Sequence, residues 1–578
     1  MRCENGTCQI LPIYASSATL SLGGLQLAVV IKEITDAEEQ SAYAHLTDLH
    51  YRGQTVHGRT AKLIVRTFDP AYPLVIGFIE LATPFFMNKP RSRILNENFT
   101  DGHIGWKSWD IHTLRKNIHR IVRISRTVVS PEFRGFGIGG ILVEHAAEFA
   151  RNRWQVAGQM PCFMEISADM LKFVPYVRQA GMRYIGETEG NLSRVEKDMQ
   201  YLIERFGDGG SDTKEFEQIS GILDQQIARM KKSIELMQEH KISAKQFSRR
   251  LRRLSVRSVL RDFDLFRGIV SLPKPTYLMG LTEYSQKFLN DRLNAVGPTE
   301  PSYTAPIQIT PLAGSMRLTG LSITYTTQVR RTVATHAIQQ AFDISPTNIR
   351  TNAIQGLTCE ISPCSIVLVE GPSGSGKTTL LESMLNQDFP NTVNVEGEIE
   401  LPEGFRPYSF QPLRSRKSLV ELFDDTEIGH ALYFLGHAGL SEPFLYLKRF
   451  EELSKGQQYR ALLAQMLAST SNVWIADEFC SNLDEITANL VSDNVQRIAR
   501  QYGVTLIAAT SNPQPFIHSL RPDMVIRLSS TSQCSVLTGD EYIRALRITN
   551  RRSSPIQHLA TKDCSLLFAA SGSTTTMI

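Results

Sequence analysis

Short apolar runs alternate with helical stretches over the first third of the chain. The runs LAVVIKEI, AKLIVRTF, LVIGFIELA and CFMEIS have the length and the β-branched composition of strands, and an amphipathic helix is predicted from near Gly137. Strands interleaved with helices predict an α/β domain, which we place at residues 26–192.

The pattern changes at Ser193 to long, charge-rich helical sequence, interrupted by GDGGSDT and SLPKPTY. Residues 193–296 are therefore predicted to form a helical linker or arm, and GPTEPSY is predicted to be a hinge after it. An α/β pattern returns over 320–536. The last segment, 537–578, ends in CSLLFAASGSTTTMI and is predicted to be a frayed tail.

A glycine-rich segment in the second α/β region has the context of a phosphate-binding loop. The buried-strand run SIVLVE leads directly into GPSGSGKTT, and the apolar helix TLLESML follows. Glycines let the backbone wrap a phosphate closely, while a lysine reaches the β- and γ-phosphates and a hydroxyl binds Mg²⁺. The predicted nucleotide-binding residues are Gly371, Gly374, Gly376, Lys377, Thr378 and Thr379.

A second strand, NVWIADEF, ends in Asp477 and Glu478. A carboxylate at the tip of such a strand can hold the Mg²⁺ shell, and the next carboxylate can orient or deprotonate the attacking water. We therefore predict Asp477 as a metal ligand, together with Thr378, and Glu478 as the catalytic base.

The sequence between these elements resembles the ABC ATPase family. LSKGQQYRALLAQMLA matches the signature motif of that family, Gln411 in YSFQPL matches its Q-loop glutamine, and SNLD matches its D-loop. The resemblance covers roughly residues 320–535. It implies ATP and Mg²⁺ as cofactors, Gln411 as a catalytic and metal-contacting residue, and further nucleotide contacts from Ser454, Gly456, Gln457 and Asp484.

The same resemblance implies an ATP-dependent homodimer, because each site in this family takes the phosphate loop and the signature motif from opposite protomers. Two positions depart from the family pattern. Ser511 stands where a histidine usually contacts the γ-phosphate, which predicts slow turnover or another γ-phosphate sensor. Phe342 is the candidate for the aromatic residue that stacks on adenine, with core packing as the alternative.

A second glycine-rich turn occurs in the first domain, in IVRISRTVVSPEFRGFGIGG. A turn of this kind at a helix start can bind a pyrophosphate through its free amides. The order of strand, turn and helix, followed by CFMEIS and PYVRQAGMRYIG, resembles GNAT N-acetyltransferases. This resemblance implies that acetyl-CoA binds at Arg134, Gly135, Gly137 and Gly139.

The sequence does not rank the catalytic residues of this domain. Tyr176 is a candidate general acid, although it stands one position away from the place that the family pattern predicts, and a packing role is the alternative. The candidate bases are Glu80, Glu165, His50 and Asp110. The whole arrangement resembles a prokaryotic and phage family in which an acetyltransferase-like domain precedes a soluble ABC ATPase.

Charge is weak over the whole chain, with a net charge of +4, but it is strong locally. Residues 241–267 hold nine Lys or Arg against two Asp, a local charge of +7. Phe247, Leu251 and Leu254 are predicted to pack inward. The arginines predicted to turn outward and bind DNA or RNA are Arg249, Arg250, Arg252, Arg253 and Arg257. The alternative is a solvated helix face that pairs with acids of the ATPase domain.

Composition narrows the class of protein. The chain holds 42% apolar and 21% charged residues, lacks a long apolar run, and has eight scattered cysteines with no CxxC pair. We therefore expect a soluble cytoplasmic protein without a membrane partner, a disulfide framework or a zinc ribbon. Three functions remain open: an ATP-regulated acyltransferase acting on or with nucleic acid, a nucleic-acid-binding ATPase switch with a non-catalytic GNAT module, and the ATPase subunit of a transporter.

Overall fold

The computed structural model describes most of the chain, and the following account is restricted to that part. The described residues are 2–4, 7–9, 12–22, 25–48, 58–156, 158–207, 224–252, 266, 269–270, 273–299, 307–344, 348–385, 389–390, 392–411, 413–423 and 428–546.

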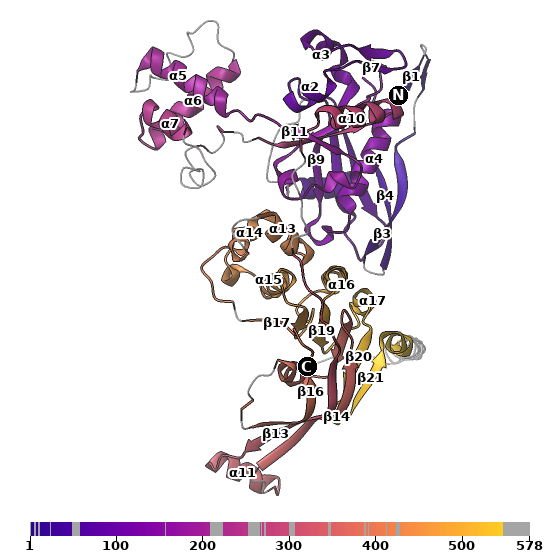
Figure 1. Cartoon of the computed structure of the whole chain (residues 1–578), viewed down its shortest axis with the longest axis vertical. Coiled ribbons are helices and arrows are strands. Elements are labelled where there is room, and N and C mark those ends of the chain that lie inside the picture. Colours follow the sequence, from indigo (N-terminus) through magenta and orange to yellow (C-terminus); the bar gives the residue numbers. More distant parts are fainter. Residues whose placement is uncertain are drawn as a thin grey trace, which may run out of the picture.

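The N-terminal domain is built on an eight-stranded sheet (Figure 1). The strand order is β11-β12-β10-β9-β6-β5-β4-β3, and every neighbouring pair is antiparallel except β9 and β10. The strands are β3 (Ala15–Leu22), β4 (Leu25–Glu33), β5 (Thr60–Thr67), β6 (Val75–Ala82), β9 (Ile121–Val129), β10 (Phe163–Ser167), β11 (Arg183–Glu187) and β12 (Pro275–Gly280).

Helices cover both faces of this sheet, so the central strand β6 is buried along its whole length. Helix α4 (Ile138–Arg153) packs Leu142 and Ala146 on one face, and α1 (Ala37–Asp48) packs Tyr43 against Phe78 on the other. Tyr14 is also buried in this core. The domain therefore begins before the predicted boundary at residue 26.

Smaller elements complete this domain. Trp106 and Trp109 pack with Phe99 and Phe163 in a separate apolar cluster beside the sheet. The elements are β1 (Arg2–Glu4), β2 (Thr7–Gln9), α2 (Lys89–Leu95), β7 (Phe99–Asp101), β8 (Ile104–Trp106), α3 (Ile111–Asn117) and α10 (Glu283–Val296).

The predicted linker at 193–296 is instead an insertion into the first domain. Helices α5 (Leu192–Phe206), α6 (Asp224–Glu239) and α7 (Ala244–Arg252) share a small core of their own. After them the chain returns to the sheet, where β12 pairs with both β10 and β11. The short apolar run of β12 lies between charge-rich helices, which hid it from the sequence pattern. Figure 1 shows the three helices standing apart from the sheet beyond β11.

The C-terminal domain is centred on a six-stranded sheet of order β17-β18-β19-β15-β20-β21. Its strands are parallel except β21. They are β15 (Ile366–Glu370), β17 (Pro407–Ser409), β18 (Val473–Ala476), β19 (Thr505–Thr510), β20 (Met524–Leu528) and β21 (Cys534–Thr538). A second, antiparallel sheet contains β13 (Met316–Gln328), β14 (Asn348–Ile361) and β16 (Val393–Glu400).

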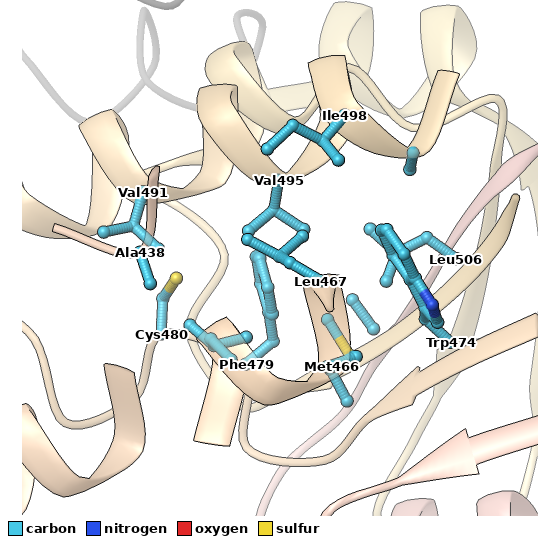
Figure 2. Close-up of a cluster of buried hydrophobic side chains, with 14 of the residues drawn as sticks. Ala438, Met466, Leu467, Trp474, Phe479, Cys480, Val491, Val495, Ile498 and Leu506 are labelled. Atoms are coloured by element: carbon cyan, nitrogen blue, oxygen red, sulfur yellow. The ribbon is translucent and has the colours of Figure 1, made fainter. Parts of the chain in front are cut away.

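Helices of this domain pack on the central sheet and form a helical subdomain beside it (Figure 1). Figure 2 shows the core between them, in which Val491 lies beside Ala438 and Val495 points toward Phe479. The helices are α11 (Val333–Ala341), α12 (Lys377–Met384), α13 (Ile428–His437), α14 (Pro443–Tyr446), α15 (Lys455–Leu467), α16 (Glu485–Tyr502) and α17 (Ile517–Leu520).

The domain extends beyond both predicted boundaries. Leu312, before residue 320, is buried in its core, and Tyr542, after residue 536, is only 2% exposed. The predicted tail therefore starts inside the folded domain, and its part from 547 to 578 lies outside the described residues. The predicted class is confirmed: a mixed-sheet α/β domain, a basic helical segment and a second α/β domain with a helical subdomain.

No helix in the described ranges is both long enough and apolar enough to span a bilayer.

Candidate functional site

The phosphate loop joins β15 to α12, as its sequence predicts. Gly376 caps α12 with a φ of 89°, a left-handed conformation that favours glycine. Lys377 donates hydrogen bonds from Nζ to the carbonyls of Gly371 (2.7 Å) and Pro372 (2.9 Å). Partial burial lowers the pKa of Lys377, while Asp477 and Glu478 oppose this shift. The ammonium group thus lies over the loop, where a nucleotide phosphate can replace the carbonyls as its partner.

Two oxygen-bearing side chains that could hold Mg²⁺ meet at the carboxyl ends of the parallel strands. The hydroxyl of Thr378 donates to Oδ2 of Asp477 at 2.6 Å. Asp477 follows β18, and Thr378 lies in the first turn of the helix after β15, so the carboxyl ends of two parallel strands bring them together. A hydroxyl and one carboxylate, completed by phosphate oxygens and water, fit the coordination that Mg²⁺ favours in nucleotide sites.

Glu478 lies at the same end of the sheet. Its backbone has a φ of 48°, unusual for a residue other than glycine, and its amide donates to Oδ1 of Asp477 at 2.9 Å. The next residue, Phe479, is buried in the core of the domain and so anchors this turn of the chain. Ser511 follows the neighbouring strand β19 and is exposed. Glu478, the predicted base, and Ser511, which stands at the family's histidine position, therefore lie at the same end of two neighbouring strands.

The signature motif and the D-loop contact each other. Ser454 caps α15 in a reciprocal pair of hydrogen bonds with Gln457. A Cβ on Gly456 would lie 3.1 Å from the carbonyl of Asn482, so only a small residue lets the D-loop approach this helix. Asp484 caps the following helix, α16.

The Q-loop residue follows the edge strand of the central sheet. Gln411 lies after β17, is exposed, and donates to Ser409 Oγ at 3.3 Å. Its side chain is therefore accessible from solvent in this structure.

Phe342, the residue predicted to stack on adenine, lies on the surface of the second domain. Phe342 lies at the end of α11, outside the apolar core, and is 69% exposed. Tyr325 of β13 instead reaches the phosphate-loop helix, where its hydroxyl hydrogen-bonds to Thr379. The exposure of Phe342 counts against the core-packing alternative, so its role in adenine stacking stays a prediction. Tyr325, at the end of the strand-like run MRLTGLSITY, is a second candidate.

The glycine-rich turn of the first domain follows β9, at the place where β9 and β10 diverge. Strands β9 and β10 pair in parallel only from Ile121 to Arg123, after which β9 continues with β6 alone. The turn then leads into α4, which is capped by Gly137 with a φ of 75°. Gly137 is exposed, and a Cβ there would contact nothing within 4 Å. The space on the Cβ side of Gly137 is therefore open at the start of α4, the helix that follows the strand β9.

Tyr176 lies against this loop, since a Cβ on Gly139 would approach its ring to 2.9 Å. The ring is partly buried in the core that includes α4. The contact explains why glycine is required at Gly139, and it is compatible with both the packing and the catalytic interpretation of Tyr176.

The structure separates the candidate bases. Glu165 is fully buried in an ion pair with Arg91 at 2.9 Å, and Asp110 caps α3 by accepting from the Thr113 amide at 2.8 Å. Both carboxylates therefore have structural partners. Glu80 is 4% exposed and lies 3.6 Å from Arg126, and its Oε2 is buried without a hydrogen-bond partner among the described residues. His50 lies outside the described residues.

The basic segment forms part of the helical insertion. Phe247 and Leu251 are buried, as predicted, while the side chains of Arg249, Arg250 and Arg252 are exposed on α7. Arg252 pairs with Glu196 of α5 at 2.7 Å, so its acidic partner comes from the insertion itself. Arg253, Leu254 and Arg257 lie outside the described residues.

Comparisons with known proteins agree with this geometry. Residues 354–481 match the family model described as ABC transporter, and residues 76–162 match the acetyltransferase (GNAT) family. The chain is 30% identical to the lipoprotein-releasing system ATP-binding protein LolD of Paramagnetospirillum magneticum over 201 residues, which cover 30% of this chain and 86% of that protein. It is 27% identical to the phosphonates import ATP-binding protein PhnC of Thiobacillus denitrificans, over 27% of this chain and 70% of that protein.

Among solved structures, the chain resembles a dimeric, post-hydrolysis state of the ATP-binding cassette MJ0796 bound to ADP and Pi, with 18% identity and a TM-score of 0.30. That similarity covers 39% of this chain and 98% of the other. With the phosphate loop, the acidic strand end and the signature helix in place, the chain belongs to the ABC ATPase family, hydrolyses ATP, and carries a GNAT acetyltransferase domain ahead of its ATPase domain.

Proposed function

We propose that the protein is an ATP-driven switch whose GNAT domain binds acetyl-CoA and transfers the acyl group to an acceptor on, or bound with, nucleic acid. The observation that carries this proposal is the open space at Gly137, at the start of α4, together with the early end of the pairing between β9 and β10. A glycine-rich turn at a helix start can accept a pyrophosphate on its amides, with the pantetheine arm between the two strands.

In the ATPase domain, Lys377 binds the β- and γ-phosphates, Thr378 and Asp477 hold Mg²⁺, and Glu478 activates water. The other nucleotide contacts keep the roles predicted above. Tyr325 is a second candidate, beside Phe342, for the adenine contact, because it lies beside the phosphate-loop helix.

ATP-dependent pairing of two chains is part of the proposal. Ser454 and Asp484 cap exposed helix starts, and Gly456 lets the D-loop pack against the signature helix. The helix starts offer free amides and the positive end of a helix dipole to a phosphate. A second chain that supplies this surface to the ATP of the first completes two equivalent sites.

The position of the helical insertion supports a nucleic-acid acceptor. β12 begins at Pro275, opposite the carboxyl end of β10 at Ser167, and the insertion leaves and re-enters the sheet there. Because β9 and β10 run in parallel, the acyl-CoA turn lies at the same end of the sheet. The exposed arginines of α7 thus belong to a module mounted at the end where acyl transfer would occur.

Two alternatives make different predictions. A non-catalytic GNAT module would bind acetyl-CoA without transferring the acetyl group. The relatives LolD and PhnC favour a transporter subunit, which would require a separate membrane partner. Purification from native membranes with such a partner would favour this third function.

A single purification tests the proposal. Mass spectrometry of the full chain, isolated at low salt, should detect retained acetyl-CoA and nucleic acid, and incubation with labelled acetyl-CoA should label the co-purified nucleic acid. If about five phosphates are neutralised, the slope of log affinity against log salt for duplex DNA should be roughly −4. Negligible affinity for DNA and RNA at low salt, with and without ATP, would exclude the nucleic-acid part.

A further inference from the structure

The turn that forms the candidate acyl-CoA site is also held by the ATPase domain. Arg134 donates from Nε to the Val129 carbonyl of its own domain (2.9 Å) and from Nη1 to the carbonyl of Ser441 in the ATPase domain. One residue later, the carbonyl of Gly135 accepts from Nη2 of Arg497 at 3.5 Å. Two consecutive residues of the turn therefore contact two different segments of the ATPase.

One face of α16 supplies most of this contact. Leu490, Asn494 and Arg497 are spaced by four and three residues, which places them on one side of a helix. Leu490 is 3% exposed and packs into the core of the N-terminal domain, and Asn494 is 2% exposed. Val491 and Val495 point into the core of the ATPase (Figure 2). Helix α16 is thus buried on both sides, with one domain on each.

Asn494 and Arg497 act together. The side-chain oxygen of Asn494 accepts from Nη2 of Arg497 at 2.5 Å, so the amide fixes the guanidinium group that reaches Gly135. Arg497 thus reaches the turn of the first domain, while Asn494 on the same helix holds its guanidinium group in place.

His437, at the end of α13, closes the contact from the other side. A Cβ on Gly135 would lie 3.7 Å from both His437 Nδ1 and Asn494 Nδ2, and Gly135 has a φ of 92°. His437 Nδ1 is buried, and the side chain of Asn494 lies beside the imidazole ring. The turn thus fits between α13 and α16 at a glycine.

Helix α16 and the loop around Ser441 are both connected to the motifs that are proposed to bind ATP across the dimer. Asp484 caps α16, thirteen residues and therefore roughly 20 Å along the helix from Arg497. In the signature helix, Arg460 donates to the carbonyl of Gly439 at 2.9 Å, two residues before Ser441. The D-loop and the signature helix are each connected to the acyl-CoA turn through one rigid element or one short loop.

We propose that the acyl-CoA site is a two-domain site, in which Asn494 and Arg497 are positioning residues that couple acetyl-CoA binding to the nucleotide state of the ATPase. This inference rests on the proposed function, because it needs both ligands to bind. If the bound nucleotide favours one arrangement of α16 relative to the turn, it changes the affinity for acetyl-CoA by some factor. Acetyl-CoA must then change the affinity for the nucleotide by the same factor.

Binding measurements on the full chain test this coupling. The dissociation constant for acetyl-CoA is measured by calorimetry with and without a non-hydrolysable ATP analogue, and the reciprocal titration is measured as well. We expect a change of at least about fivefold in the wild type and the same factor in both directions. Arg497→Ala should reduce the change to less than about twofold, and Arg497→Lys should restore part of it through one remaining donor.

Arg500→Ala is the matched control. It removes the same charge from the same helix, but Arg500 bonds to the Arg521 carbonyl (2.8 Å) and to Asp523 (3.2 Å) within the ATPase. It should keep the full coupling. Asn494→Ala provides a second test if Arg497→Ala does not fold.

The outcomes are distinguishable. Equal acetyl-CoA affinity with and without the analogue in a wild-type chain that binds both, or full coupling in Arg497→Ala, would overturn the inference and leave the proposed function intact. Absence of acetyl-CoA binding in the wild type and in Arg500→Ala would overturn both.

Discussion

Thr378 and Asp477 lie in direct contact, with 2.6 Å between the hydroxyl and carboxylate oxygens. Replacing Asp477 by Asn keeps the size and one acceptor oxygen but removes the charge that attracts Mg²⁺. We expect the Mg²⁺ concentration for half-maximal ATPase activity to rise by about tenfold or more, corresponding to at least about 1.4 kcal/mol. A magnesium titration of ATPase rate measures this, and an unchanged midpoint would contradict the assignment of Asp477.

Glu478→Gln should separate ATP binding from hydrolysis. The amide has the shape of the carboxylate but cannot take a proton from water, so turnover should fall by about a hundredfold or more. ATP should then remain bound and hold two chains together. Light scattering in ATP and Mg²⁺ should give twice the monomer mass, with the ADP-bound variant as control. A monomeric variant with the wild-type rate would refute the role of Glu478.

Gly137 allows a matched pair of substitutions. Its φ of 75° is one that Asp and Asn tolerate better than other side chains, and its Cβ direction is open. Gly137→Asp places a negative charge where the pyrophosphate is proposed to bind, whereas Gly137→Asn has nearly the same shape. Calorimetry should show weaker acetyl-CoA binding for Asp than for Asn by about tenfold or more. Equal affinities would argue against a phosphate at this turn.

We expect the stability of the folded chain to depend on pH through His437, which lies at the contact between the two domains. Burial, assisted by the positive charge of Arg497, lowers the pKa of His437 from 6.5 to about 4. Between these values the unfolded chain binds the proton and the folded chain does not. Stability is therefore greatest above pH 6.5 and falls as the pH decreases toward 4.

The expected loss from His437 is about 1–3 kcal/mol, reduced from the full shift because the residue is not completely buried. Thermal unfolding of the wild type and of His437→Asn between pH 7.5 and 4.5 measures it. The wild type should lose more stability than the variant over this range. Parallel curves for the two proteins would show that His437 does not titrate in this way.

Contiguous motifs were predictable from the sequence, and contacts between distant segments were not. Lys377 and Thr378 follow an apolar strand directly, so local spacing placed them correctly. The exposed position of Phe342 was not predictable, because α11 is inserted between β13 and β14 without changing the pairing of these strands.

Two other features had weak local signals. β12 is six residues long, and its role depends on pairing with strands up to about a hundred positions away. The contact of Gly135 with Arg497 joins residues 362 positions apart and depends on how two domains dock, which no local pattern encodes.

The helical insertion begins and ends at neighbouring positions of the first sheet. The amide of Thr188 donates to the carbonyl of Lys274 at 2.9 Å, so the chain leaves and re-enters the sheet side by side. A short turn between these two residues would close the β11–β12 hairpin without altering any strand pairing. The helices between them can therefore be exchanged as a cassette, which would let the same ATPase and acyl-CoA machinery be directed to different acceptors.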